Sequence, residues 1–154
     1  MADGSEQTLQ TLDQAGTPRV QPPRPLPDEL PTPFWQGCLE HRLMIQRCQT
    51  SGHFIHWPRP VCRFCLSTDL APEQVSGRGT LYSWTVVNQA FHAYYADKVP
   101  YLLATVELVE QPKLMFFTRL TACLEDELSI GMPMEVVFED AAPDLTFPLF
   151  QPAG

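Results

Sequence analysis

Three cysteines in the middle of the chain are spaced like metal ligands. Cys62 and Cys65 form a C-x2-C pair, and Cys48 lies fourteen residues before Cys62. Two thiolates separated by two residues can bind one tetrahedral zinc ion, and Cys48 stands where the second pair of a zinc ribbon belongs. The residue that would complete that second pair is Ser51.

The fourth ligand is the open question of this site. Serine is a poor zinc ligand because its hydroxyl group stays protonated near neutral pH, so a substitute is needed. His53 is the nearest substitute and His56 the next, and three cysteines with one histidine are an accepted structural ligand set. The alternative is a knuckle without metal, held by its own hydrophobic contacts. We interpret Cys38 and Cys123 as small buried apolar residues. The candidate metal ligands are therefore Cys48, Cys62, Cys65 and His53.

Short strands and turns must position these ligands. Residues 43–47 and 54–57 have the composition of two strands, and the turn residues 50–52 lie between them. Pro58 and Pro60 end the second strand and lead into the C-x2-C pair. Before the ribbon, residues 34–40 have the apolar spacing of a short helix, with Pro33 near its first turn.

The C-terminal half is rich in β-branched and aromatic runs separated by turn residues. Five such runs at this spacing favour a small Greek-key barrel of the OB type, because a sandwich would need about seven strands. The acidic segment 123–128 reads as a short helix or turn. The predicted strands are residues 80–87, 101–108, 113–120, 134–138 and 144–150. We therefore expect a mainly β chain with a short N-terminal helix, a zinc ribbon and a five-stranded OB-type barrel.

Three regions follow from these elements. Residues 1–33 hold seven of the 16 prolines and have no apolar periodicity, which predicts a flexible proline-rich tail. Residues 34–72 form the helix and the ribbon, and residues 73–152 form the barrel.

The acidic N-terminus resembles neither a secretory signal nor a presequence, and no apolar stretch reaches the roughly 20 residues of a membrane span. We expect a cytoplasmic protein without membrane contact, and five cysteines in a reducing compartment argue against a disulfide framework.

The charge distribution disfavours nucleic-acid binding. The chain carries a formal net charge of −8, and from residue 81 onward ten acidic residues face three basic ones. A phosphate backbone would be repelled by such a surface. The alternative hypothesis is nevertheless a zinc-ribbon and OB-fold module that binds nucleic acid, with aromatic side chains stacking on bases. The aromatic residues concerned are Tyr82, Trp84, Phe116 and Phe117.

No catalytic set is recognisable. The sequence lacks a glycine-rich phosphate loop before a helix, a zinc-protease motif and a serine elbow, and its histidines have no nucleophile in a recognisable setting. Aromatic residues offer binding surfaces instead. The loop of residues 88–99 is one candidate, since loops concentrate binding residues, and an aromatic pair on the predicted helix is another. The alternatives are a loop that packs on itself and an aromatic pair that only fills the core. The residues are Phe91, His92, Tyr94 and Tyr95 in the loop, and Phe34 and Trp35 on the helix.

Several short motifs in a fixed order resemble one family. They are Phe34-Trp35-x-Gly37, Arg47-Cys48, Pro58-Arg59-Pro60-x-Cys62-x-x-Cys65, Ser76-Gly77-x-Gly79-Thr80-x-Tyr82-Ser83, Pro100-Tyr101 and Ile130-Gly131-Met132-Pro133-x-Glu135-Val136-x-Phe138-Glu139. Their order and spacing, from residue 34 to residue 152, resemble the acyl-CoA-associated OB-fold proteins with an N-terminal rubredoxin-like zinc ribbon. The ribbon of that family normally has four cysteines, and Ser51 departs from the pattern.

The resemblance implies a non-catalytic partner of thiolase-superfamily enzymes. Such enzymes include steroid side-chain retro-aldolases, and the partner forms a hetero-oligomer with them and borders the path of the acyl-CoA. We therefore expect an accessory subunit for an aldolase, thiolase or acyltransferase that acts on a bulky acyl-CoA. Arg47, Arg59 and Arg63 could face the phosphates of CoA, because the guanidinium group matches phosphate geometry. Their alternative role is to keep the ribbon soluble.

Overall fold

The C-terminal half forms one five-stranded sheet in the computed structural model, which describes residues 20–26 and 30–154. The strands are β4 (Arg78–Val87), β5 (Tyr101–Leu108), β6 (Met115–Arg119), β7 (Pro133–Ala142) and β8 (Leu145–Pro152). They lie in the order β6-β5-β4-β7-β8, and every neighbouring pair is antiparallel. Two short 3-10 helices, η1 (Ala93–Tyr95) and η2 (Glu125–Glu127), lie in the connections, the second within the predicted acidic turn.

The two outer strands of this sheet meet and close it into a barrel. Leu120, just after β6, forms a parallel bridge with Phe150 on β8, and the Thr121 N–H donates to the Phe150 carbonyl at 2.9 Å. The buried Thr118 hydroxyl also donates to the Pro148 carbonyl at 2.9 Å. Strand order and closure are those of a five-stranded Greek-key barrel. The predicted OB-type barrel is confirmed.

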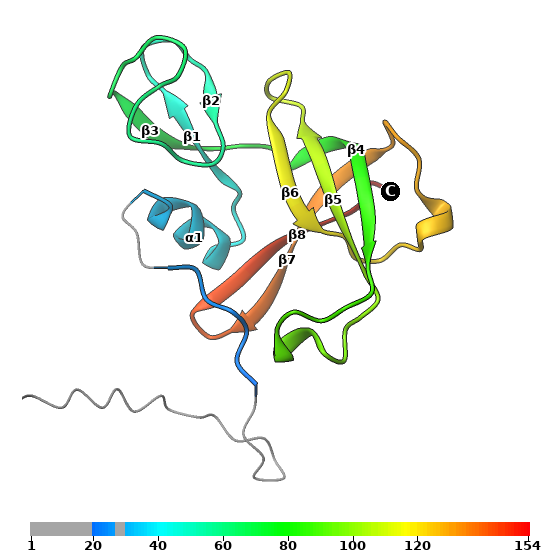
Figure 1. Ribbon diagram of the computed structural model, residues 1–154. Coiled ribbons are helices and arrows are strands. Elements are labelled where there is room, and N and C mark those ends of the chain that lie inside the picture. Colours follow the sequence, from blue (N-terminus) through cyan, green and yellow to red (C-terminus); the bar gives the residue numbers. More distant parts are fainter. Residues whose placement is uncertain (1–19, 27–29) are drawn as a thin grey trace, which may run out of the picture.

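The metal-ligand segment forms a separate three-stranded sheet, with β1 (Met44–Cys48) in the centre, β2 (Phe54–Ile55) on one side and β3 (Leu70–Gln74) on the other. The sequence predicted the first two strands and missed β3, because Pro72 argues against a strand. Pro72 is tolerated since β3 is an edge strand, where a missing N–H breaks no second ladder. Figure 1 shows this sheet beside the barrel, joined to it by β3 and the short link to β4.

Helix α1 (Thr32–Leu39) joins the two sheets into one core. It begins two residues before the predicted start, because Pro33 is accepted in the first helical turn. The Phe34 ring lies 5.1 Å from the ring of Trp57, which follows β2, and 6.0 Å from the ring of Phe116 on β6. Phe34 is only 4% exposed. It therefore packs mainly in the core, and its predicted partner-facing role stays a prediction.

Most of the predicted tail, residues 1–19 and 27–29, lies outside the described part of the chain. Within residues 20–26, Pro22 is buried and Arg24 donates to the carboxylate of Asp144 at 2.6 Å. These residues therefore lie against the β7–β8 hairpin (Figure 1), and the flexibility of the proline-rich tail stays a prediction. No helix in the described part of the chain is long and apolar enough to cross a membrane.

A glycine at the start of β4 allows the close approach of β5. A Cβ atom on Gly79 would lie 2.5 Å from Val106 Cγ1 and 2.6 Å from the Glu107 carbonyl oxygen. We expect Gly79→Ala to lower the free energy of unfolding by about 2 kcal/mol, because the backbone of β5 would have to move. Chemical denaturation measures this change. Ser83→Ala, at an exposed position of the same strand, is the control and should change stability by less than about 0.5 kcal/mol.

Candidate functional site

The three predicted cysteine ligands meet at one point. The sulfur atoms of Cys48, Cys62 and Cys65 all lie within 4.8 Å of one another. The separation between Cys48 and Cys65 is 3.6 Å, which is too long for a disulfide of about 2 Å and close to the sulfur spacing around one zinc ion. Cys48 and Cys62 are fully buried. The geometry therefore fits a metal ion bound by three thiolates.

Hydrogen bonds from Ser51 prepare the Cys48 thiol for metal binding. The backbone N–H of Ser51 donates to the Cys48 sulfur at 3.4 Å. Hydrogen bonds from the side chain and the backbone of Ser51 lower the pKa of Cys48 to about 6. A thiol with such a pKa is largely ionised near neutral pH, and the thiolate is the form that binds a metal.

His53 does not join the cysteine cluster. Its Nδ1 lies 3.1 Å from the Ser51 hydroxyl oxygen, and its ring stacks on Phe64 with ring centres 4.0 Å apart. The Ser51 hydroxyl oxygen lies 3.6 Å from the Cys62 sulfur. The structure thus places the Ser51 hydroxyl group beside the Cys62 sulfur, and His53 lies outside the cluster of the three sulfurs.

A pocket of about 520 Å³ lies between helix α1, residues 56–57 at the end of β2, and the barrel. Its volume lies within the range of small-molecule sites, and its lining is mainly apolar. Phe117 and Trp57 are 66% and 45% exposed. We call this the aromatic pocket; its ring-bearing residues are Phe34, Trp35, His56, Trp57, Tyr95, Phe116, Phe117 and Phe147.

Three basic residues lie beside the aromatic pocket. Arg59, Arg63 and Lys113 line a small cavity of about 50 Å³, and His56 lines both this cavity and the aromatic pocket. Among the described residues, neither Arg59 nor Arg63 forms an ion pair. We call Arg59, Arg63 and Lys113 the basic cluster. The basic cluster therefore carries positive charge that no ion pair at Arg59 or Arg63 neutralises within the described ranges, and it lies next to the apolar pocket.

His56, between these two features, is held neutral. Its ring stacks on Phe116 at 4.7 Å, and its Nδ1 has no hydrogen-bond partner among the described residues. Burial lowers the pKa of His56 to about 4, against about 6.5 for an unfolded histidine. Between these values the unfolded chain binds the proton and the folded chain does not. The contribution of His56 to stability is therefore full above about pH 6.5 and is lost as the pH falls toward about 4.

This difference predicts a pH effect. When the pH is lowered from about 7 to about 4.5, the free energy of unfolding should fall in the unsubstituted protein by about 2 kcal/mol more than in the His56→Phe variant. The phenylalanine keeps a ring at this position but cannot titrate. Urea denaturation at a series of pH values measures both slopes. Equal slopes in the two proteins would show that His56 is not held neutral.

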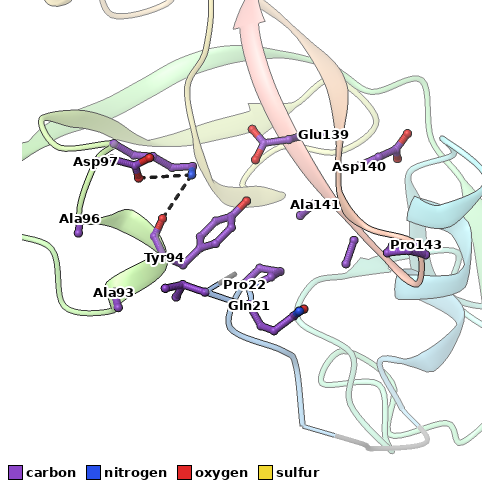
Figure 2. Close-up of a pocket in the computed structure, with 13 residues that line it drawn as sticks. Gln21, Pro22, Ala93, Tyr94, Ala96, Asp97, Glu139, Asp140, Ala141 and Pro143 are labelled. Carbon is purple, nitrogen blue, oxygen red and sulfur yellow. Dashed lines mark hydrogen bonds and ion pairs between the residues drawn. The ribbon is translucent and has the colours of Figure 1, made fainter. Parts of the chain in front are cut away.

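A second pocket, of about 900 Å³, lies between residues 20–22, the η1 loop and the β7–β8 hairpin. Figure 2 shows the ring of Tyr94 between Pro22 and Glu139. Lys98 lies 4.1 Å from the centre of the Tyr94 ring and pairs with Asp97. The pocket is acidic because its lining includes one lysine and three carboxylates, those of Asp97, Glu139 and Asp140. It does not suit a phosphate group.

The remaining predicted contact residues fall in different places. Tyr95 and Trp35 line the aromatic pocket, while Tyr94 lines the acidic pocket. Arg47 is engaged by the Glu73 carboxylate at 2.7 Å and by the Gly52 carbonyl at 2.8 Å, so it is not part of the basic cluster.

Two residues of the loop face neither pocket. Phe91 is 84% exposed and His92 is exposed, and neither lines one of the pockets described above. Sequence reasoning assigned Trp57 and Lys113 to no site, and it considered His56 only as a substitute metal ligand. The adjacent aromatic residues 56–57 and 116–117 were the available signal.

The same division into ribbon and barrel occurs in known proteins. The family model for the ChsH2 rubredoxin-like zinc ribbon domain matches residues 35–71, and that for the ChsH2 C-terminal OB-fold domain matches residues 72–139. A DUF35 domain-containing scaffold protein of Pyrococcus furiosus is 33% identical over 105 residues, which cover 68% of this chain and 74% of that protein. The chain belongs to the ChsH2 (DUF35) family.

Other relatives of this ChsH2-family chain extend the comparison. A chain in the solved structure described as Ltp2-ChsH2(DUF35) aldolase has 33% identity and a TM-score of 0.77, over 85% of this chain and 100% of that one. A probable enoyl-CoA hydratase alpha subunit of Thermomonospora curvata is 35% identical over 136 residues, or 88% of this chain. This chain spans only 41% of the length of that relative.

Proposed function

We propose that this chain is a non-catalytic accessory subunit that binds a thiolase-like aldolase and forms a hetero-oligomer with it. The observation that carries the proposal is the similarity to the ChsH2(DUF35) chain of the Ltp2-ChsH2 aldolase, which covers the whole of that chain. The scaffold name of the Pyrococcus furiosus relative supports the same role. In such an assembly the partner supplies the reacting groups, and this chain supplies stability and contact surface.

The aromatic pocket and the basic cluster support a place beside the acyl-CoA of the partner. An acyl-CoA has an apolar acyl group at one end and phosphates at the other, and His56 links a feature suited to each. Guanidinium groups bind phosphate with two hydrogen bonds, and neither Arg59 nor Arg63 forms an ion pair in the described part of the chain. The pocket volume of about 520 Å³ suits a bulky acyl group, and the family resemblance points to steroid side-chain degradation.

Zinc is the cofactor that we propose for the ribbon, bound by Cys48, Cys62 and Cys65. Its role would be structural, because a metal bound by buried thiolates cross-links the strands around it. All five cysteines are free, which supports a cytoplasmic, reducing location.

Co-expression with a thiolase-like aldolase tests the subunit role. We expect the two chains to co-elute in size-exclusion chromatography, and we expect lyase activity toward an acyl-CoA from the complex but not from this chain alone. Separate elution, with the enzyme fully active by itself, would defeat the proposal. So would turnover of a thioester by this chain alone.

The nucleic-acid alternative gains no support from the fold. Phe116, one of the four aromatic residues proposed to stack on bases, is only 3% exposed and packs in the core. Arg119, one of three basic residues after residue 80, pairs with Glu139. A barrel face with so few free cations would bind oligonucleotides weakly.

A further inference from the structure

We propose that Ser51 is the fourth ligand of the metal site and that His53 is the residue that positions it. The site would then bind metal through three sulfurs and one oxygen. This inference rests on the zinc site proposed above and names the residue that completes it. It replaces the sequence-based expectation of a histidine ligand.

The distances around Ser51 match a tetrahedral site. With zinc–sulfur bonds of about 2.3 Å and zinc–oxygen bonds of about 2.1 Å, tetrahedral angles place two sulfurs about 3.8 Å apart and an oxygen about 3.6 Å from a sulfur. The structure has 3.6 Å between the Cys48 and Cys65 sulfurs and 3.6 Å between Ser51 Oγ and the Cys62 sulfur.

Ser51 faces the cluster with both its hydroxyl group and its backbone. Its Oγ lies 3.6 Å from the Cys62 sulfur, and its N–H donates to the Cys48 sulfur at 3.4 Å. This position suits the remaining corner of a tetrahedron whose other corners are the three sulfurs. No histidine or carboxylate among the described residues shares this position with the three sulfurs.

His53 is positioned to orient the Ser51 hydroxyl group. Its Nδ1 lies 3.1 Å from Ser51 Oγ, and its ring is fixed by stacking on Phe64 with an interplanar angle of 16°. With the metal bound, the Ser51 O–H would donate to Nδ1 and no longer to a cysteine sulfur, and both oxygen lone pairs would remain for the metal, even with the hydroxyl protonated. An outer residue that orients a ligand in this way typically changes metal affinity by 10- to 100-fold.

A double-mutant cycle on the full chain tests this arrangement, with zinc affinity measured by competition against a chelator. Ser51→Ala removes the oxygen, and His53→Phe keeps a ring on Phe64 but removes the nitrogen. We expect each to weaken zinc binding about tenfold. The double variant should be no weaker than Ser51→Ala alone, because His53 acts only through Ser51. Ser51→Cys should bind zinc more tightly than the original protein, and His53→Phe should then have no effect.

Three results would overturn the proposal. A further tenfold loss from His53→Phe in the Ser51→Ala background would make His53 a direct ligand. An unchanged zinc affinity and an unchanged cobalt(II) absorption spectrum in Ser51→Ala would remove Ser51 from the site. Binding of no metal by the original protein would remove the site itself.

The cycle is separable from the subunit role. Each variant is also tested for co-elution with the aldolase partner. If the partner co-elutes while the cycle fails, the ligand assignment falls and the accessory role stands. If the cycle succeeds without co-elution, the ligand assignment stands and the accessory role falls.

Discussion

Cys62→Ala is expected to abolish metal binding and to open the metal end of the ribbon while the barrel stays folded. Cys62 is fully buried, and the hydrophobic cluster around it holds only Cys48 and Ile55, with Leu70 packed against them. Such a small core cannot stabilise the segment without a cross-link. Structural zinc in small domains supplies about 10–16 kcal/mol of apparent binding free energy, which depends on the complete ligand set.

Two measurements check this result. Elemental analysis should show the metal content falling from about one ion per chain to near zero, in line with the metal dependence of small zinc domains. Hydrogen exchange should show lost protection in residues 48–69, with β4 to β8 unchanged. Cys123→Ala is the matched control, because Cys123 is only partly buried and lies outside the metal cluster. Full metal content in Cys62→Ala would contradict the assignment of Cys62 as a ligand.

Phe117→Ala is expected to weaken binding of the aldolase partner by about 30-fold, equivalent to about 2 kcal/mol. Phe117 lines the aromatic pocket and is 66% exposed, so its removal should leave the core of the isolated chain intact. Exposed aromatic side chains beside a pocket are typical anchors of a protein interface. Surface plasmon resonance with immobilised aldolase measures the change.

Tyr82→Ala provides the matched control. Tyr82 is an aromatic residue of similar exposure, 56%, but it lies on β4 and lines none of the pockets described above. Its removal should leave the affinity within about twofold of the original. If both variants bind equally well, or if Tyr82→Ala is the weaker, the aromatic pocket is not the partner surface. The melting temperature of each variant separates loss of contact from loss of folding.

The strand pattern was predictable because alternation and turn residues are local signals. The five barrel strands were each found to within a few residues, whereas β3 was missed because Pro72 and Glu73 are poor strand residues. The extension of β7 to Ala142 was also missed. Its last residues alternate poorly, and an irregularity between Asp140 and Ala142 interrupts the register there.

The three cysteine ligands could be predicted from their spacing in the sequence, but the fourth ligand of the metal site could not. Both Ser51 and His53 lie within reach in the sequence, and only the fold shows the histidine stacked on Phe64 and turned toward the serine. The aromatic pocket was hidden for a different reason. Its lining comes from α1, the end of the ribbon, β6 and β8, which no local pattern brings together.

The position of α1 between the ribbon and the barrel has a consequence for dissecting the molecule. Phe34 covers Phe116 of the barrel while it touches Trp57 of the ribbon, and the same buried cluster includes Leu43 and Ile45. A fragment starting at Glu73 would therefore expose apolar surface and should aggregate, although the barrel strands are all present. A substitution at Phe34 must suit both neighbours at once, so the ribbon and the barrel should be exchanged or engineered as a pair.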